Sequence, residues 1–387
     1  MLNLFPNKTE EPLDDAERLA WLRLIRTENV GPITFYQLIR KFGSASKALE
    51  ALPELAKRGG RKAPLSAASA YDAEHEYKAL YKMGGQIVTV LDDTYPLALS
   101  AVDDAPPVLS VLGDASLLNR PCVGIVGARN ASLNGRKFAQ KLAYDLGTRG
   151  QIVVSGLARG IDTAAHHGAI ETGTIAVVAG GVDVVYPEEN QKLYEAIIEK
   201  GAVVAESKLG QKPYAAAFPR RNRIVSGLAR GVVVVEATQR SGSLITARMA
   251  GEQGREVYAV PGSPLDPRAA GPNHLIREGA ILVRGADDVL EGLLDFAGHG
   301  MREQFTPVDL LPGDLYFSED ESDAALIDAV LPHLSFTPIN VDELVRVCHV
   351  TVSNLQSALL DLELAGRIIR LPGGRVVLVE EAQNIRD

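Results

Sequence analysis

Short runs of apolar residues alternate with amphipathic stretches between residues 120 and 283 of the chain. Each run is an almost unbroken series of valine, isoleucine and alanine, which is typical of strands buried on both faces of a parallel sheet. The stretches between the runs, such as 136–149 and 188–200, carry apolar residues at helical spacing. We therefore predict a doubly wound, mostly parallel, Rossmann-like α/β domain over residues 116–295. Its predicted strands are CVGIVGA, QIVVSGLA, TIAVVAGG, GAVVAES, GVVVVEA, EVYAVPG and AILV.

A helical pattern fills the first part of the chain and predicts a domain of the SAM or helix-hairpin-helix type over residues 14–115. Gly31 and Pro32 form a turn, and apolar residues recur at helical spacing after them. Gly43 and Ser44 then offer a helix stop and an N-cap for the next helix. Such hairpins can present backbone amides to DNA phosphates, but no lysine or arginine stands beside this glycine turn. A packing role is therefore favoured.

The last part of the chain predicts a linker followed by a winged-helix domain. Residues 296–322 show no convincing period and are predicted to be the linker. Three helical stretches and a hairpin around a Gly-Gly pair predict a winged helix over residues 323–382. Its recognition helix, predicted over 351–365, carries Asp361 and Glu363 and has no lysine or arginine. Such a helix suits a phosphate-lined groove poorly, so a protein contact or a dispensable role is favoured over duplex binding.

The composition is that of a globular protein in a reducing compartment. The 387 residues exceed one ordinary domain and suggest two or three. The first residues show no signal-peptide pattern, and no window reaches the roughly 18 apolar residues of a spanning helix. Cys122 and Cys348 lie in different predicted domains, which favours free thiols over a disulfide framework or a zinc site. We expect a cytoplasmic protein without membrane insertion.

The distribution of charge singles out the middle of the chain. The formal net charge is −9, which argues against a protein that coats duplex DNA through its overall charge. Residues 120–160 nevertheless hold seven Lys/Arg against one acid, and residues 212–248 again hold seven against one. From residue 320 onward the balance reverses to five bases and eleven acids. An anionic ligand would bind in the middle of the chain, unless these cations form scattered solvated faces.

The turns after the predicted strands share one edge of the sheet, where doubly wound folds bind ligands. The turn in GIVGARNASLNG lacks the G-x-G-x-x-G order of dinucleotide binders, and Ser155 stands where they place a ribose-binding acid. We therefore expect no nicotinamide cofactor. The same turns suit phosphate, because glycine turns and helix starts expose backbone amides and arginine binds phosphate bidentately. The segment FPRRNR, residues 218–223, adds an aromatic ring that can stack on an unpaired base.

Five stretches of the α/β region resemble the DNA-processing protein A (DprA, also called Smf) family. They are VGIVGARNAS, SGLARGIDTAAHHGAI, TIAVVAGGVDVVYPEEN, the segment from FPRRNR to YAVPG, and GPNHLIREGA. The resemblance runs in order over residues 123–280, and the flanking segments fit the family's N-terminal helical and C-terminal winged-helix modules more loosely. It implies a bacterial cytoplasmic protein that binds single-stranded DNA during natural transformation and loads the RecA recombinase onto it. It also implies a homodimer formed through the Rossmann domain.

Carried onto this sequence, the resemblance gives a DNA-binding site and a dimer surface. Ala128 departs from the family, because many members have a hydroxyl residue before the arginine of the first turn. The dimer surface falls on the last strands and on the helix that contains residues 274–278. The expected DNA-binding residues are Gly127, Arg129, Ser132, Arg159, Phe218, Arg221, Asn222, Arg223, Ser241, Gly242 and Ser243.

A second interpretation is enzymatic. The region is also related to nucleoside-monophosphate phosphoribohydrolases resembling the LOG family, which place a catalytic glutamate within one helical turn of a glycine-rich turn. The corresponding stretch SGSLITAR supplies no carboxylate, and Glu252 lies more than a turn further on. Without an acid the oxocarbenium-like transition state loses its partner. We therefore predict a protein that is not an enzyme.

Two further interpretations concern metal binding and scaffolding. His166 and His167 are adjacent, so in a helix they point about 100° apart and do not form the i, i+4 pair of zinc ligands. A packing role is favoured for them, and no metal site is predicted. The sequence also leaves open a pure scaffold function. In that case the turns after the strands have no ligand, and the flanking domains bind partners. Loss of single-strand binding in arginine variants would distinguish a binding site from a scaffold.

Overall fold

The computed structural model describes residues 13–63, 65–298, 323–371 and 373–379. The chain forms two compact units, one built from residues 75–310 and the other from both ends of the chain, 1–74 and 311–387. The predicted linker over 296–322 lies almost entirely outside the described residues. Across the described ranges, no helix has the length and hydropathy needed to cross a bilayer.

A nine-stranded sheet runs through the unit of residues 75–310, in the order β1-β2-β6-β5-β4-β3-β7-β8-β9. From β6 to β9 in this order, every neighbouring pair is parallel. Each of these strands coincides with one of the predicted apolar runs, so the predicted Rossmann-like sheet is confirmed. The strands are β3 (Cys122–Val126), β4 (Ile152–Ser155), β5 (Thr174–Val177), β6 (Ala202–Ala205), β7 (Gly231–Val234), β8 (Glu256–Ala259) and β9 (Ile281–Leu282).

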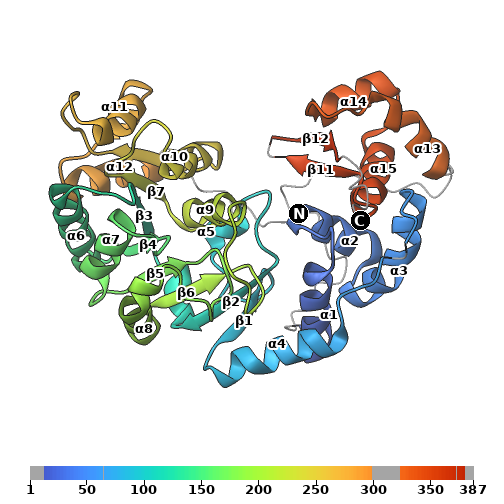
Figure 1. The fold of residues 1–387 in the computed structure, drawn as a ribbon, viewed down its shortest axis with the longest axis horizontal. Coiled ribbons are helices and arrows are strands. Elements are labelled where there is room, and N and C mark those ends of the chain that lie inside the picture. The colour runs from blue at the N-terminus through green and yellow to red at the C-terminus, as the bar shows by residue number, and fades with distance from the viewer. Residues whose placement is uncertain (1–12, 64, 299–322, 372, 380–387) are drawn as a thin grey trace, which may run out of the picture. The chain divides into compact units, whose positions relative to one another are not determined.

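Helices cover both faces of this sheet (Figure 1). Val123 and Ile125 of β3 pack among residues of α6 (Leu133–Thr148), α7 (Ile161–Ala169) and α12 (Ala286–Gly298). Cys122 and Val126 of the same strand pack among residues of α5 (Leu97–Ser100), α9 (Ala217–Leu228) and α10 (Gly242–Glu252). This alternation explains why the strands read as continuous apolar runs, since neither face meets water.

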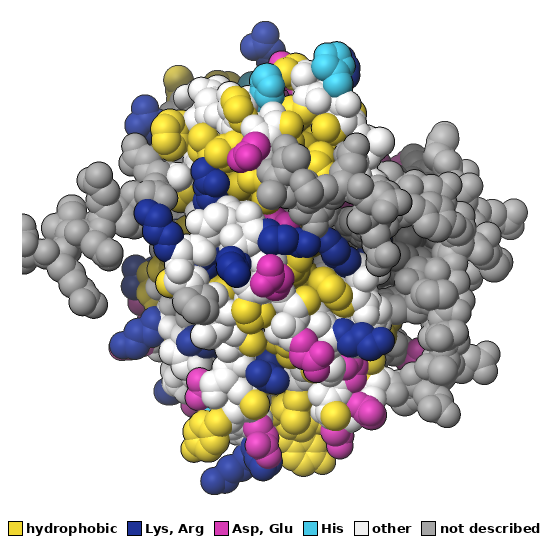
Figure 2. Space-filling model, turned by 90° about the vertical axis from the view of Figure 1, so that its right-hand side faces the viewer, with side chains coloured by type: hydrophobic (Ala, Val, Ile, Leu, Met, Phe, Trp, Pro, Cys, Tyr) yellow, Lys and Arg dark blue, Asp and Glu magenta, His cyan; other side chains and the backbone are white. Residues whose placement is uncertain are grey.

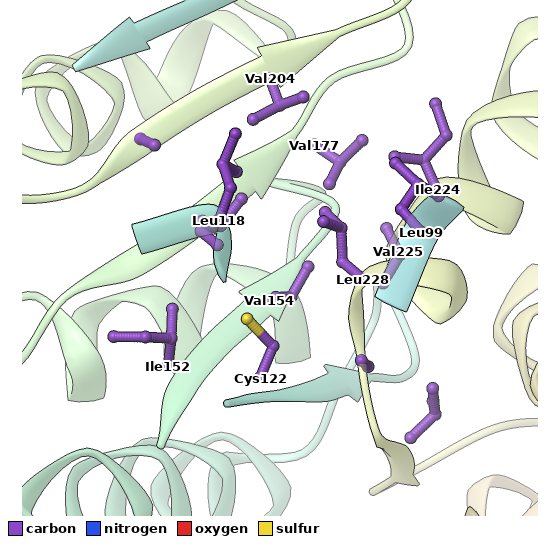
Figure 3. Packing of buried hydrophobic residues seen from close by; sticks show 14 of the residues in the cluster. Leu99, Leu118, Cys122, Ile152, Val154, Val177, Val204, Ile224, Val225 and Leu228 are labelled. Carbon is purple, nitrogen blue, oxygen red and sulfur yellow. The ribbon is translucent and has the colours of Figure 1, made fainter. Parts of the chain in front are cut away.

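The second of these clusters joins strand and helix side chains tightly (Figure 3). Val154 and Val177 of neighbouring strands lie with Val225 and Leu228 of α9, and all four are at most 2% exposed. Burying such a side chain contributes roughly 1.5–3 kcal/mol relative to leaving it in water. The packing therefore fixes α9 against the sheet and holds the turns at the carboxyl ends of the strands.

Two antiparallel strands at one edge of the sheet come from a segment that the sequence pattern assigned to the helical domain. β1 (Gln86–Thr89) pairs with β2 (Val108–Gly113), and β2 pairs with β6. Both lie in the unit of residues 75–310. The helical domain therefore ends before the predicted boundary at residue 115. Both strands are about as long as the parallel strands, but the helices α4 (Ala70–Lys82) and α5 flank β1 in the sequence, and the helical interpretation was extended across them.

The two ends of the chain form the other unit. Its first part contains α1 (Asp15–Arg26), α2 (Pro32–Phe42) and α3 (Ala45–Arg58). Gly43 ends α2 in the left-handed conformation, with φ +79°, and the Ser44 side chain accepts from the backbone N–H of Lys47. Both predicted caps are therefore confirmed. The second part is the predicted winged helix, with α13 (Asp323–Val330), β10 (Ile339–Asn340), α14 (Val341–Cys348), α15 (Val352–Leu364), β11 (Ile368–Leu371) and β12 (Arg375–Leu378).

Candidate functional site

A pocket lies at the carboxyl ends of β3, β4 and β5, where the turns after these strands meet the beginning of α9. About 470 Å³ of space lies among its lining residues, and part of that space is open to solvent. Because the strands are parallel, turns from distant parts of the sequence reach the same edge. The pocket includes four predicted binding residues, Arg129, Arg159, Phe218 and Arg221. The full lining is Arg129, Gly156, Ala158, Arg159, Val178, Ala179, Gly180, Val184, Tyr186, Pro187, Pro213, Phe218 and Arg221.

Arg221 is buried and joins the ends of two strands. Its Nη1 donates to the carbonyl oxygen of Gly156 at 2.5 Å and to the carbonyl oxygen of Val177. Burial, partly opposed by Asp162, lowers the pKa of Arg221 to about 10, so the guanidinium remains charged at neutral pH. A Cβ at position 156 would lie 2.5 Å from Nη1 of Arg221. The β4 turn therefore needs glycine where it meets this side chain.

Asp162 is a buried carboxylate next to this arginine. Its Oδ2 accepts from the backbone N–H groups of Gly156 at 3.1 Å and Ala158 at 3.3 Å. Burial raises the pKa of Asp162 to about 6, against the opposing effects of Arg221 and of the two N–H groups. Asp162 thus orders the turn that carries Arg159. The sequence pattern gave it no chemical role, because its partners become visible only in the folded turn.

Arg129, Phe218 and Tyr186 lie in a row along one side of the pocket. The Arg129 Cζ atom lies 5.0 Å from the centroid of the Phe218 ring, within cation–π distance. The ring centroids of Phe218 and Tyr186 are 5.7 Å apart, with the planes tilted by 53°. Tyr186 is 48% exposed. These three side chains place aromatic rings and a guanidinium where they could contact a flat ligand that carries negative charge.

Arg159 forms an exposed ion pair with Glu189. The Nε to Oε1 distance is 2.5 Å, and the two side chains are 60% and 54% exposed. Pairs of this kind contribute about 0–1 kcal/mol. A phosphate can therefore replace Glu189 as the partner of Arg159 at small cost.

Two residues of the first turn have structural roles and do not line the pocket. Ser132 caps α6 by accepting from the N–H of Gly135 at 2.8 Å, and its hydroxyl donates to Glu236 at 2.5 Å. The N–H of Ser132 donates to the other carboxylate oxygen of Glu236 at 2.8 Å. A Cβ at Gly127 would lie 2.6 Å from Cγ1 of Ile161, so packing alone requires that glycine.

Arg223 points away from the pocket. It stands two positions after Arg221 in α9, and side chains two positions apart on a helix differ in direction by about 200°. Its Nη2 lies 2.6 Å from Glu206 and its Nε lies 3.3 Å from Asp104, with the arginine side chain 8% exposed. Asn222, between the two arginines, accepts from Nε of Arg221 at 3.2 Å. The FPRRNR segment is therefore split between the pocket and an internal ion-pair cluster.

Ser241, Gly242 and Ser243 begin α10 and also lie outside the pocket lining. The hydroxyls of the two serines are 2.7 Å apart and hydrogen-bonded to each other. Ser241 lines a separate groove between α10 and α11 (Ala270–Arg277). The apolar lining of that groove includes Leu244, Ile245, Val257 and Leu275. The polar and charged lining consists of Gln239, Arg240, Ser241, Arg248, His274 and Glu278.

The histidine pair does not form a metal site. His166 is fully buried, and its Nδ1 lies 2.8 Å from the hydroxyl of Thr174. Burial lowers the pKa of His166 to about 3, so the ring is neutral. His167 is exposed. Among the described residues no group of three or more His, Cys, Asp or Glu side chains is placed to hold a metal ion.

Tyr186 lines the pocket, although the sequence motif that contains it was given no chemical role. It follows β5 at the same edge as the arginine turns, but the motif VDVVYPEEN carries no cation that would have drawn attention to it. An aromatic residue placed just beyond a buried strand, on an edge that already holds arginines, is the signal that could have identified it.

The mostly parallel sheet with helices on both faces, and the pocket of three arginines and two aromatic rings at the carboxyl ends of its strands, place the chain in the class of doubly wound α/β proteins. Within this class, the chain belongs to the family of DNA recombination-mediator protein A, whose model matches residues 86–294. Models of a DprA-like N-terminal HHH domain and a DprA winged helix domain match residues 15–79 and 318–374. The predicted DprA/Smf membership and both flanking modules are confirmed.

Named relatives and solved structures agree with this assignment. Protein Smf of Escherichia coli (strain K12) is 40% identical over 288 residues, which cover 73% of this chain and 75% of Smf. The crystal structure of DNA processing protein A from Streptococcus pneumoniae matches with a TM-score of 0.61 and 37% identity, covering 72% of this chain and 98% of that chain. DNA processing protein A from Helicobacter pylori, whose structure is described for its single-stranded DNA binding mode, matches with a TM-score of 0.50 and 29% identity, covering 54% of this chain and 96% of that chain.

Proposed function

We propose that this protein binds single-stranded DNA in the pocket at the carboxyl ends of β3, β4 and β5. The arrangement of Arg129, Phe218 and Tyr186 beside the buried Arg221 supports this proposal most strongly. Guanidinium groups hold the phosphates of a strand, and exposed rings stack on bases that have no complement. A duplex keeps its bases stacked inside and offers only phosphates, so the aromatic rings favour the single strand. The likeness to the Helicobacter pylori protein, which binds single-stranded DNA, points the same way.

The proposed site contains fewer of the expected DNA-binding residues than the sequence predicted. Arg129, Arg159, Phe218 and Arg221 line the pocket, and Tyr186 joins them. Gly127, Ser132 and Asn222 contribute by shaping the turns and helix that carry these residues. Arg223 and the segment 241–243 serve the internal structure and the neighbouring groove, so the proposal assigns them no contact with DNA.

We propose that the cellular role of the protein is recombination mediation in the cytoplasm. We propose that the protein holds incoming single strands during natural transformation and passes them to the RecA recombinase. The family description and the DNA processing proteins among the relatives support this role. It predicts that the purified protein speeds RecA-driven strand exchange on single strands coated by a single-strand-binding protein. An Arg129→Ala variant that still stimulated the exchange fully would contradict the link between the pocket and the role.

We also propose a homodimer built on the groove between α10 and α11 and the edge strand β9. An exposed strand edge pairs readily with another chain, and this groove is lined by Leu244, Ile245 and Leu275. Leu282 of β9 is 41% exposed beside it. Two copies joined at this edge would bury these apolar side chains and carry two DNA pockets.

The pocket does not favour the enzymatic alternative. Of the described residues that line it, none is a carboxylate. Thr246 and Ala247 are buried in α10, and Arg248 is exposed, so the segment that corresponds to the hydrolase glutamate supplies no acid. We propose a binding protein without nucleotide hydrolase activity. Release of adenine from AMP by the purified protein, lost on mutation of the pocket, would reverse that conclusion.

The binding proposal is tested by titrating fluorescent single-stranded and duplex oligonucleotides of the same sequence. We expect preference for the single strand and loss of binding in Arg129→Ala. Arg230→Ala is the matched control, because Arg230 is exposed and precedes β7. It therefore lies at the amino end of a strand, whereas the pocket lies at the carboxyl ends. Equal affinity for the duplex, or equal losses in both variants, would refute the assignment of the pocket.

A further inference from the structure

The recognition helix α15 of the winged helix is buried on more than one side. Leu355, Ala358, Leu359 and Leu362 belong to the core of the winged helix itself. Four other residues of the helix are also buried but lie outside that core: Ser357, Leu360, Asp361 and Leu364. In a winged helix that reads DNA, the side of this helix turned away from the core enters the major groove. Here that side is covered by protein.

The covering elements are α2 and α3 and the turn before α2. Arg58, at the end of α3, has its Nε 3.1 Å from the carboxylate of Asp361, which is fully buried. Lys41 of α2 donates to the hydroxyl of Ser357 at 3.2 Å. Asn29 donates from Nδ2 to the carbonyl oxygen of Leu364 at 3.3 Å.

A second set of hydrogen bonds continues the same interface toward β11. Gln37 of α2 donates from Nε2 to Oε1 of Gln356 at 2.9 Å. Arg370 donates to that same oxygen at 2.8 Å and to Oε1 of Gln37 at 3.3 Å. The polar groups at this interface are thus paired with each other, as groups withdrawn from water need to be.

Gly59 shows how closely the two parts approach. A Cβ at this position would lie 1.9 Å from the backbone oxygen of Asp361 and 2.8 Å from the Cβ of Ala365. Its backbone has φ −65° and ψ −3°, a conformation open to any residue. Glycine is therefore needed here for the contact with α15 and not for the local fold of α3.

The excess of acidic over basic residues in the winged helix also disfavours binding to duplex DNA. Residues 323–379 carry six acids and four arginines, and α15 has no basic side chain. One of those arginines, Arg370, is paired with Glu363 at 3.0 Å and is largely buried. Figure 2 shows the side of the molecule that faces right in Figure 1, where basic and acidic side chains are interspersed. Duplex binding depends on neutralising a row of phosphates, which such a surface does poorly.

We propose that the winged helix is a protein-binding module whose partner is the chain's own N-terminal helical domain, and that its recognition helix does not read duplex DNA. The recognition helix joins the two ends of the chain into one unit. This proposal is independent of the pocket at the sheet edge.

The interface can be tested with one methyl group in the full chain. Gly59→Ala places a Cβ against Asp361, whereas Gly31→Ala, the matched control, adds a Cβ with no atom within 4 Å. We expect amide hydrogens of α15 to exchange about tenfold faster in Gly59→Ala than in the parent, with Gly31→Ala unchanged. Unchanged exchange in Gly59→Ala would show that the interface does not hold in solution and would overturn the proposal.

Duplex binding decides whether the helix has a hidden DNA-reading role. We expect Gly59→Ala to bind a duplex oligonucleotide no better than the parent, in both the parent and the Arg129→Ala background. New duplex binding on release of α15 would mean that the N-terminal helices mask a DNA reader, and the proposal would be wrong. The Arg129→Ala background separates this result from any binding by the pocket.

A cross-link between α2 and α15 tests the same interface without destabilising the fold. Gln37→Cys and Gln356→Cys, combined with Cys348→Ser, place two thiols across the interface, and Cys122 is buried. A short bis-maleimide is expected to join them within one chain, leaving duplex binding unchanged. Each single-cysteine variant is the control. Cross-links formed only between copies, or loss of duplex binding on cross-linking, would contradict the proposal.

Discussion

Arg221 and Arg223 stand two positions apart on α9 and face opposite sides of the helix. Arg221 donates to the carbonyl oxygens at the ends of the β4 and β5 strands, beside the pocket. Arg223 is held between Glu206 and Asp104. One short basic segment therefore contains a residue of the proposed binding site and a residue of the internal structure, and the two should respond differently to mutation.

Arg223→Met should reduce stability and spare binding. Removing one partner of a buried ion pair leaves the carboxylates of Glu206 and Asp104 without it, which typically lowers the free energy of unfolding by about 3–5 kcal/mol. Urea unfolding measures this loss. Single-strand affinity per folded molecule should stay at the parent value. A stable variant that had lost its affinity would place Arg223 in the binding site after all.

Phe218→Ala should weaken single-strand binding through lost stacking. Stacking of one base on an aromatic ring contributes roughly 1–3 kcal/mol, so we expect a loss of about 5- to 150-fold in affinity. The slope of log affinity against log salt should not change, because no phosphate contact is removed. Tyr144→Ala serves as the control, since Tyr144 is 55% exposed on α6 and does not line the pocket. Fluorescence anisotropy over a salt series would show both effects.

Arg129→Ala and Arg159→Ala should each flatten the salt dependence. A single-strand phosphate contact contributes about 0.7 to the magnitude of the log–log slope. Loss of one contact should reduce the slope by about that amount, and the double variant by about twice as much. Arg230→Ala should leave the slope unchanged. A slope that stayed constant in Arg129→Ala would mean that this guanidinium does not meet a phosphate.

The buried carboxyl of Asp162 should make stability depend on pH. Its pKa is raised to about 6 from an ordinary 3.8, so the folded protein holds this proton more tightly than the unfolded chain. The stabilisation that this proton gives the folded parent protein is fully present below the ordinary pKa of an aspartate, and it is lost as the pH rises through 6. Asp162→Asn stays neutral throughout. Its free energy of unfolding relative to the parent should therefore rise by about 1 kcal/mol between pH 5 and pH 7.

Urea unfolding at pH 5, 6 and 7 provides the check on Asp162. Asp287→Asn is the control, because that side chain is 87% exposed. Parallel pH profiles for the parent and Asp162→Asn would show that the Asp162 carboxyl does not titrate in this range.

Leu275→Arg should separate the proposed dimer. The side chain lines the groove between α10 and α11, which also holds Arg240 and Arg248. A further arginine would replace an apolar contact and add like-charge repulsion. Sedimentation velocity should show monomers at concentrations where the parent sediments as a dimer. Leu133→Arg, at an exposed position on α6, should leave the parent's state unchanged. A parent that is itself monomeric would remove the dimer from the proposal.

The apolar pattern predicted the sheet well because burial on both faces leaves a continuous signal. Every parallel strand coincides with an apolar run, such as the run that ends at Val126. These strands could therefore be predicted without any tertiary information. The antiparallel strands β1 and β2 were missed because the helical interpretation of the first part of the chain was extended to residue 115, although both strands are about as long as the parallel strands. The pairing of β2 with β6, which adds both strands to the sheet, depends on the tertiary fold.

The sequence predicts which side chains could bind an anion, but it does not show which of them line the pocket. Arginine and serine were selected for their chemistry, but a distant residue decides whether each is available. Glu236 meets Ser132 across 104 positions, and Asp104 meets Arg223 across 119. Residue type in a turn predicts what a side chain can bind, and only the fold shows what it already binds.

The close approach of Gly59 to Asp361 has a consequence for biosynthesis. The ribosome releases α3 long before α15 exists, so the face of α3 that ends at Gly59 must stay uncovered while the whole Rossmann-like unit is made. The helices translated first therefore complete their packing last. A chain cut short before the winged helix would carry that bare face permanently, and chaperones or proteases would meet it.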